Sequence, residues 1–256
     1  MCLIVLAWKT HPDFPLVVVA NRDEYFERPT AAAHWWPEPK RLLAGRDEEA
    51  GGSWLGVSAD GRFAALTNYR DPSRLSPEGK RSRGELVVDA LTRPALPAWL
   101  DGLDADADRY NPFNLMVGTK DELFVFESVS RHLRSLTPGI HGVSNHLLNT
   151  PWPKLQAARR QLEAALASPL SPERLVELLR NDQPYPDDQL PDTGVPLAWE
   201  RALSSCFIRA PGYGTRSTSV VMADRHGRID FMEQTWDTSG HAVGQVRERF
   251  TVSPGS

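Results

Sequence analysis

The first 24 residues constrain the fold more strongly than any other stretch of this chain. Two runs, 2–8 and 15–21, are apolar at successive positions and rich in β-branched residues. Such runs are typical of strands that are buried on both faces. The segment between them carries two prolines and predicts a turn. An antiparallel hairpin around that turn places Cys2 opposite residues 20–23, and therefore beside charged side chains.

Further strands and helices are predicted along the chain. A second hairpin is expected over 53–69, with its turn at Asp60-Gly61. Other strands are expected within 113–136 (with turns at 120–121 and near 130) and over 139–148, 204–210, 217–224 and 228–236. Helices are expected over 84–100 (interrupted by Pro94 and Pro97), 152–168 and 171–181, the last with Ser171 as N-cap. The proline-rich segment 184–196 predicts a long loop, of the kind that forms a lid or a disordered tip.

This order of elements argues against a doubly wound fold, because strands and helices do not alternate regularly. Strands that are apolar on both faces need cover on both sides. Two sheets stacked face to face, with helices outside, satisfy that requirement. The chain has 256 residues, which is long enough to bury a sizeable core.

Composition narrows the class of function. The formal net charge is −4, so no basic surplus indicates a nucleic acid or an anionic membrane surface as partner. No apolar run approaches the roughly 18 residues of a membrane span, and the start of the chain lacks the features of a signal peptide. The two cysteines, Cys2 and Cys206, are too few for a disulfide scaffold. We therefore expect a soluble cytoplasmic protein with two thiols.

Cys2 has two interpretations. As a small apolar residue, it belongs to the core of its strand. If Met1 is removed, Cys2 carries a free α-amine that can accept the proton of its own thiol. Arg22 would then favour the thiolate, and Asp23 or Glu24 would hold the ammonium group.

Six motifs occur in order along the chain: "MCLIVLAW", "PLVVVANRDEYFERP", "GGSWLG", "ALTNYRDP", "GVSNHLLNTPWPK" and "YGTRSTSVV". With these motifs the chain resembles the NRDE family, also called the transport and Golgi organisation 2 family. The family's arrangement is similar to that of N-terminal-nucleophile (Ntn) hydrolases of the cholylglycine hydrolase and penicillin V acylase type. The resemblance implies an α+β fold in one domain over 1–256. It is a four-layer αββα sandwich of two mostly antiparallel sheets flanked by helices.

The resemblance also implies roles for individual residues. Catalytic roles are implied at six positions: Cys2, Arg22, Asp23, Asn68, Asn145 and Arg216. Substrate contacts are expected from four more: Asn21, Glu24, Trp54 and Tyr69. Cys2 matches the nucleophile, Asn68 an oxyanion-binding asparagine, and Arg216 an active-site arginine. The acylases carry an arginine and an aspartate three residues apart, whereas Arg22 and Asp23 are adjacent. The match of these two residues with the acylase pair is therefore shifted by a position or more.

Each polar candidate also has a structural alternative. Asn68 and Asn145 suit strand ends and turns, and Arg216 suits a surface beside a glycine turn. Trp54, like Trp35-Trp36, suits an aromatic core as well as the wall of an apolar pocket.

Two hypotheses for function follow. In the first, Cys2 attacks an acyl amide or thioester with an apolar acyl group, Arg22 or Arg216 holds its head group, and no cofactor is required. In the second, the same pocket carries haem, a lipid or acyl-CoA without catalysis, since the resembled family is linked to such trafficking. The seven histidines are then candidate haem ligands, none of them singled out by a motif: His11, His34, His132, His141, His146, His226 and His241. A protein-interaction scaffold is a weaker third hypothesis, since the sequence has neither repeats nor a large charge cluster.

Overall fold

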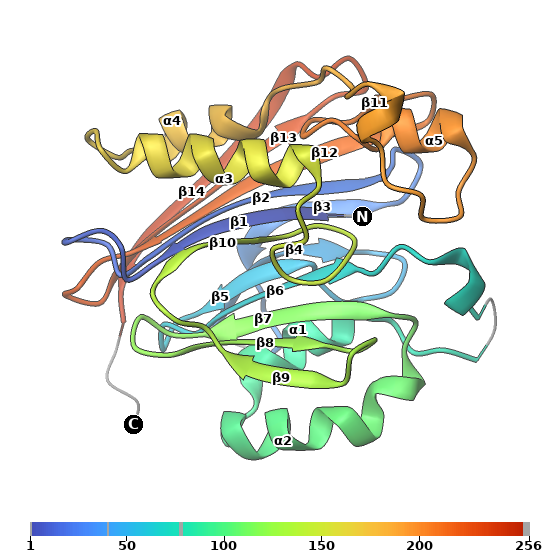
Figure 1. Cartoon of the computed structure of the whole chain (residues 1–256). Helices are drawn as coiled ribbons and strands as arrows, with labels where there is room; N and C mark the ends of the chain where they lie inside the picture. Colours follow the sequence, from blue (N-terminus) through green and yellow to red (C-terminus); the bar gives the residue numbers. More distant parts are fainter. Residues whose placement is uncertain (1, 40, 77–78, 253–256) are drawn as a thin grey trace.

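The two apolar runs form adjacent strands at the centre of the molecule (Figure 1). The computed structural model describes residues 2–39, 41–76 and 79–252. Strands β1 (Cys2–Trp8) and β2 (Leu16–Tyr25) pair antiparallel, and Cys2 lies opposite Arg22. All seven residues of β1 are buried. The predicted hairpin and its register are therefore confirmed.

The described strands form two antiparallel sheets of seven strands each. The first sheet has the order β10-β1-β2-β12-β13-β14, with β11 paired to β12. Its remaining strands are β10 (Gly139–Val143), β11 (Arg209–Ala210), β12 (Tyr213–Ala223), β13 (Arg228–Trp236) and β14 (Ala242–Thr251). The second sheet follows chain order: β3 (Thr30–Trp35), β4 (Leu42–Asp47), β5 (Leu55–Ser58), β6 (Phe63–Asn68), β7 (Phe113–Gly118), β8 (Leu123–Glu127) and β9 (His132–Ser135).

Helices cover the outer faces of both sheets, as Figure 1 shows. The second sheet is covered by α1 (Gly84–Thr92) and α2 (Leu96–Asp106). The first sheet is covered by α3 (Pro153–Ala165) and α4 (Pro172–Val176), while α5 (Leu197–Ala202) lies near one end. Short 3₁₀ helices occupy Pro72–Arg74, Ala107–Arg109, Glu177–Leu179 and Asp187–Gln189. The expected four-layer αββα sandwich of the α+β class is thus confirmed.

The alternation of side chains along β1 explains why the layers form. Ile4 and Leu6 face the second sheet and pack with residues such as Val57. Leu3 and Val5 face outward and pack against α3. Each buried aliphatic side chain contributes about 1.5–3 kcal/mol through removal from water, so a strand apolar on both faces stabilises two cores at once.

Several local predictions are confirmed. The Asp60-Gly61 turn joins β5 to β6, and Gly61 has a φ of +86° that favours glycine. The helical stretch 84–100 divides into α1 and α2, with Pro97 in the first turn of α2. Ser171 caps α4, and its hydroxyl accepts a hydrogen bond from the backbone N–H of Arg174 at 3.4 Å.

Other predictions are wrong or incomplete. A strand over 204–210 was expected, but only residues 209–210 pair in a sheet. The Ser204 and Ser205 hydroxyls donate to carbonyls within three residues, which stabilises a turn instead. Strands β3, β4 and β14 are found where the sequence predicts none. No residue of β14 is buried, so its apolar alternation is weak.

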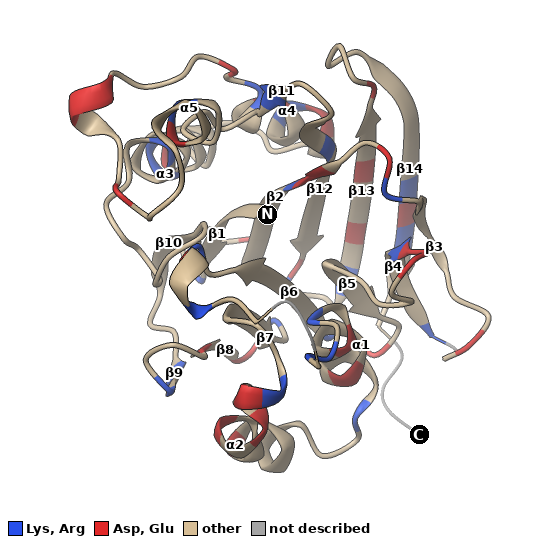
Figure 2. Cartoon of the chain, turned by 90° about the vertical axis from the view of Figure 1, so that its right-hand side faces the viewer, with Lys and Arg blue, Asp and Glu red and all other residues tan. Residues whose placement is uncertain are grey.

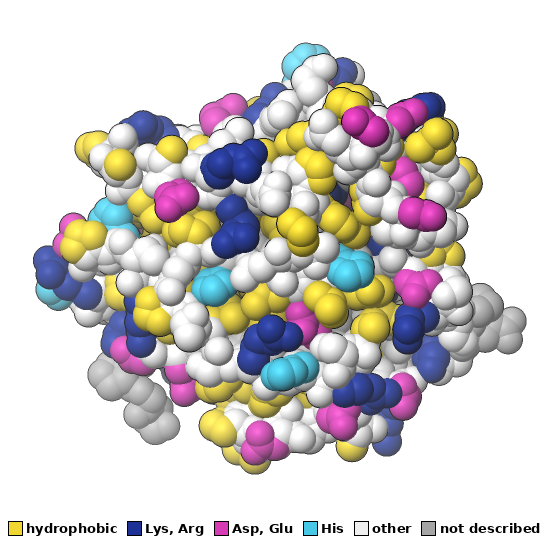
Figure 3. Space-filling model, viewed as in Figure 1, with side chains coloured by type: hydrophobic (Ala, Val, Ile, Leu, Met, Phe, Trp, Pro, Cys, Tyr) yellow, Lys and Arg dark blue, Asp and Glu magenta, His cyan; other side chains and the backbone are white. Residues whose placement is uncertain are grey.

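The N-terminal end of β1 lies right of centre in Figure 1, in the first sheet and above the second. Figure 2 faces that side and shows the charged segments of β2 beside the start of β1. On the face shown in Figure 3, basic and acidic side chains are interspersed. Among the described residues, no helix is both long and apolar enough to cross a membrane.

Candidate functional site

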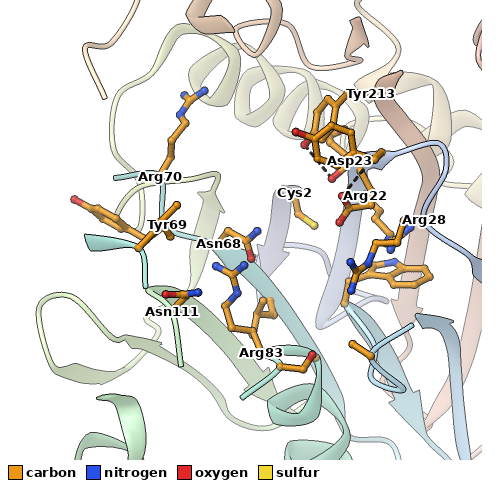
Figure 4. Close-up of a pocket in the computed structure, with 18 of the residues that line it drawn as sticks. Cys2, Arg22, Asp23, Arg28, Asn68, Tyr69, Arg70, Arg83, Asn111 and Tyr213 are labelled. Carbon is orange, nitrogen blue, oxygen red and sulfur yellow. Dashed lines mark hydrogen bonds between the residues drawn. The ribbon is translucent and has the colours of Figure 1, made fainter. Parts of the chain in front are cut away.

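A cavity of about 800 Å³ opens at the edge where β1 begins. Its walls come from both sheets, from the start of α1 and from α5. Seven of the ten predicted site residues line it: Cys2, Arg22, Asp23, Glu24, Trp54, Asn68 and Tyr69. Figure 4 shows the sulfur of Cys2 near the centre of this group. The volume is within the range of small-molecule sites.

Cys2 is the first described residue of β1, and 9% of its surface is exposed. Burial is the largest influence on its thiol and raises the pKa. The Arg22 guanidinium and the backbone N–H of Asp23 act in the opposite direction. The thiol therefore needs a base to become a nucleophile at neutral pH.

Arg22 is held in place by three contacts. Its guanidinium lies over the Trp54 ring, 4.2 Å from the ring centroid. It donates to the Thr30 hydroxyl at 3.0 Å, and Nη2 lies 3.7 Å from a carboxylate oxygen of Asp47. With only 4% of its surface exposed, Arg22 is a largely desolvated cation at the cavity wall.

Asp23 is also buried. One carboxylate oxygen accepts from the Thr215 hydroxyl at 2.7 Å, and the Tyr213 hydroxyl donates to its backbone carbonyl at 3.1 Å. Burial raises the pKa of the Asp23 carboxyl, and the positive charge of Lys154 opposes that shift. Asp23 is thus a rigidly placed acid beside Cys2.

Asn68 ends β6, and Figure 4 shows its side-chain amide directed toward Cys2. Within the described residues this amide makes no side-chain hydrogen bond, so its N–H groups can serve a ligand. Asn145 lies behind it: its side chain donates to the Asn68 backbone carbonyl at 3.0 Å. The Asn145 carbonyl accepts from the Arg70 backbone N–H at 2.7 Å. Asn145 therefore positions the end of β6 and is not among the residues that line the cavity.

The structure does not bring Asn21 or Arg216 to the cavity wall. Asn21 faces the helical layer, where its side chain donates to the carbonyls of Leu179 and Cys206. Arg216 lies in a bulge of β12, between residues 215 and 217, so the strand alternation shifts there. Its guanidinium donates to the carbonyls of Tyr25 and Arg28 at 2.9 and 2.8 Å.

A family model described as Transport and Golgi organisation 2 matches residues 1–238. The chain belongs to this family. A *Bos taurus* protein named Transport and Golgi organization protein 2 homolog is 34% identical, over 94% of this chain and 98% of its own length. The *Homo sapiens* homolog is 34% identical over 92% of this chain and 93% of its own length. The *Drosophila melanogaster* Transport and Golgi organization protein 2 is 29% identical over 92% of each.

Two solved structures are similar to this member of the transport and Golgi organisation 2 family. One is a *Caenorhabditis elegans* N-acylethanolamine-hydrolyzing acid amidase ortholog, with a TM-score of 0.43, 10% identity, and coverage of 86% of this chain and 92% of that chain. The other is a mutant of the conjugated bile acid hydrolase from *Clostridium perfringens*, with a TM-score of 0.43, 10% identity, and coverage of 100% and 99%. The αββα architecture of this chain is given by its own two sheets and the helices that cover them.

Several residues that line the cavity were not predicted from the sequence. They include two arginines, Arg70 and Arg83, and an apolar wall from Val195, Pro196, Trp199 and Leu203. The segment 184–196, which was expected to form a lid or a disordered tip, supplies part of that wall. Over the ranges that the structure describes, no group of three or more His, Cys, Asp or Glu side chains is placed to hold a metal ion.

Proposed function

We propose that this member of the transport and Golgi organisation 2 family hydrolyses acyl amides or thioesters, with Cys2 as nucleophile after removal of Met1. One observation carries the proposal. The Cys2 thiol and the Asn68 amide, which has no side-chain hydrogen bond to a described residue, face the same cavity, beside the buried Arg22 and Asp23.

The chemistry would proceed in two steps. The α-amine of Cys2 accepts the thiol proton, and the sulfur attacks the acyl carbonyl carbon. The C–N or C–S bond to the leaving group then breaks, and the leaving group takes the proton from the ammonium. Water attacks the resulting thioester, the acyl group leaves as a carboxylic acid, and the thiol re-forms.

The charges around Cys2 support these roles. A free α-amine has a pKa of about 7.7–8.0, so it can serve as base near neutral pH. Asp23 would hold the ammonium that forms, and Arg22 would favour the thiolate. The Asn68 amide would donate to the oxyanion, an interaction worth about 3–4 kcal/mol in comparable sites.

The cavity wall favours an apolar acyl group. Leu66 and Trp54 line it from the second sheet. Pro196, Trp199 and Leu203 line it near α5. An aliphatic chain placed against these side chains would gain about 0.8 kcal/mol for each buried CH₂ group.

The raised pKa of the Cys2 thiol favours a second candidate, a carrier that binds an acyl ligand in the same cavity without reaction. The cavity fits haem less well, because none of its described lining residues is a histidine. A haem in this cavity would depend on a thiolate or phenolate as its iron ligand, and the proposed hydrolysis requires no haem.

Mass spectrometry of the untagged full chain tests the hydrolase. We expect an intact mass without Met1 and, after incubation with octanoyl-N-acetylcysteamine thioester, a single octanoyl adduct. Cys2→Ala should abolish the adduct. The matched control is Cys206→Ala, since Cys206 is 2% exposed and burial raises its pKa to about 11.

Two outcomes would contradict hydrolysis by Cys2. One is a mass that retains Met1. The other is a chain that lacks Met1 but forms no adduct and releases no octanoate. Saturable binding of the thioester without an adduct would instead support the carrier.

A further inference from the structure

The cavity is lined by more basic than acidic side chains. Six basic residues contribute: Arg22, Arg28, Arg70, Lys80, Arg81 and Arg83. Three acidic residues do so: Asp23, Glu24 and Asp71. The charge of most of these arginines is balanced by carboxylates of the protein itself, so each has to be considered with its partner.

Three of the arginines are engaged in close ion pairs. Arg28 pairs with Asp47 at 2.7 Å and Glu49 at 3.0 Å. Arg70 lies 3.5 Å from a carboxylate oxygen of Glu200, and Arg81 pairs with Glu85 on the first turn of α1. Arg22 is 3.7 Å from Asp47. Each of these four arginines therefore has a carboxylate of the protein within 4 Å.

Arg83 differs from all four. Its Nη1 donates to the Pro112 carbonyl at 3.2 Å, and it forms no ion pair with a carboxylate of the described residues. The residue is partly buried, and burial lowers its pKa, while the charges of Glu24 and Cys2 act in the opposite direction. One of the five N–H groups of the guanidinium is used by the Pro112 carbonyl, so four remain for other acceptors, and no carboxylate of the described residues is paired with its charge.

The Arg83 side chain points toward the same part of the cavity as those of the other site residues. Figure 4 shows its guanidinium directed into the cavity, toward the region to which Asn68 and Cys2 also point. Lys80, which also forms no ion pair with a carboxylate of the described residues, is exposed and donates to the Asp108 carbonyl at 2.6 Å. It therefore lies toward solvent, whereas Arg83 lies within the cavity.

Close backbone packing fixes Arg83. Residue 84 begins α1, and its carbonyl accepts from the Ser53 N–H at 3.2 Å. A Cβ on Gly52 would lie 2.5 Å from the carbonyl carbon of Gly84, so only glycine permits this approach. The "GGSW" segment and the start of α1 are thus held together, and Arg83 projects from a rigid backbone.

We infer that Arg83 is the anion-binding residue of the cavity and receives a carboxylate or phosphate group of an amphiphilic ligand. The acceptor would take the free N–H groups of the guanidinium, while the ligand's apolar body lies against Trp199, Leu203 and their neighbours. This site deepens the proposed function and uses its cavity, but it does not depend on catalysis by Cys2.

Calorimetric titration of the full chain with three ten-carbon probes tests the inference: decanoate, decyl phosphate and neutral decanol. None of the three contains an acyl amide or thioester, the bonds that Cys2 is proposed to cleave. A charge-assisted hydrogen bond contributes about 1.5–3 kcal/mol, so wild type should bind an anionic probe about tenfold to a hundredfold more tightly than decanol. Tighter binding of either anionic probe than of decanol supports the site. The anionic probe that binds more tightly identifies the head group.

Variants then assign the preference to Arg83. Arg83→Gln should remove the preference for the anion while leaving decanol binding unchanged, and Arg83→Lys should retain part of it. The matched control is Arg81→Gln, a neighbouring arginine that lines the same cavity but pairs with Glu85. It should keep the full preference.

The inference is overturned if wild type binds decanol as tightly as both anions, a result that needs no variant to fold. It is also overturned if Arg83→Gln keeps the preference for the anion. The same holds if Arg83→Gln weakens the binding of decanol as much as the binding of the anionic probes. If wild type shows no anion preference but still forms the octanoyl adduct, this site alone is refuted. Absence of the adduct with the preference intact refutes the hydrolase alone.

Discussion

Lys154, at the start of α3, links the stability of the fold to the charge of the site. Only 3% of its surface is exposed, and its ammonium donates to the Leu203 carbonyl at 2.7 Å. Burial lowers its pKa from 10.5 to about 8; the charge of Arg70 adds to this shift and that of Asp23 opposes it. Its positive charge in turn opposes the rise that burial causes in the pKa of Asp23 beside Cys2.

The sign of the pH dependence follows from this shift. Below about pH 8, Lys154 carries its proton in both the folded and the unfolded chain, so it adds no pH dependence. Between about pH 8 and 10.5, unfolding takes up a proton, so the unfolding free energy rises with pH. The unfolding free energy rises by about 1.36 kcal/mol for each pH unit, which gives about 3 kcal/mol over this interval. Most of that rise is reached by pH 10.

Lys154→Met removes this titration while keeping a side chain of similar length. Urea unfolding, followed by tryptophan fluorescence at pH 7, 8, 9 and 10, measures the effect. From pH 7 to pH 10, we expect the unfolding free energy of wild type to rise by about 2–3 kcal/mol relative to that of Lys154→Met. Lys120→Met, which removes a partly exposed lysine that pairs with Asp121, controls for the loss of a positive charge. If wild type and Lys154→Met respond to pH in parallel, the reasoning is refuted.

Further substitutions test the packing around the cavity by urea unfolding. Gly52→Ala places a Cβ 2.5 Å from the carbonyl carbon of Gly84 and should destabilise the fold by about 1–3 kcal/mol. Gly102→Ala, in α2 with open space around it, should instead stabilise by about 0.5–1 kcal/mol, and equal effects of the two would contradict the steric argument. Glu200→Gln leaves the buried Arg70 without its counter-charge and should cost about 3 kcal/mol or more; a loss below about 0.5 kcal/mol would show that the pair is unimportant.

Sequence reasoning succeeded where the physical cause is local. The pairing of Cys2 with Arg22 depends on a turn and on strand periodicity within about 25 residues. The start of α4 was equally predictable, because Ser171 and the following proline act within one helical turn. Strand β14 was missed because none of its side chains is fully buried, and its position is set by pairing with β13.

The candidate site shows the same division. Cys2, Arg22 and Asp23 belong to one hairpin, so their proximity follows from local pairing. Arg216 was expected beside them, but the bulge in β12 directs it to the carbonyls of Tyr25 and Arg28. A bulge inserts one residue into the alternation, and nothing in a strand's own pattern of apolar residues specifies where that occurs.

Two neighbouring strands, their register and the thiol at their edge therefore follow from the order of residues alone, because hairpin geometry is set over short distances along the chain. The cavity depends on the tertiary structure. Its walls come from segments spread between residues 2 and 213 of the sequence, and Arg83 reaches it only because α1 packs against the Gly52 backbone. Such contacts depend on how two sheets and their helices pack together, a property that many distant residues determine jointly and no single stretch encodes.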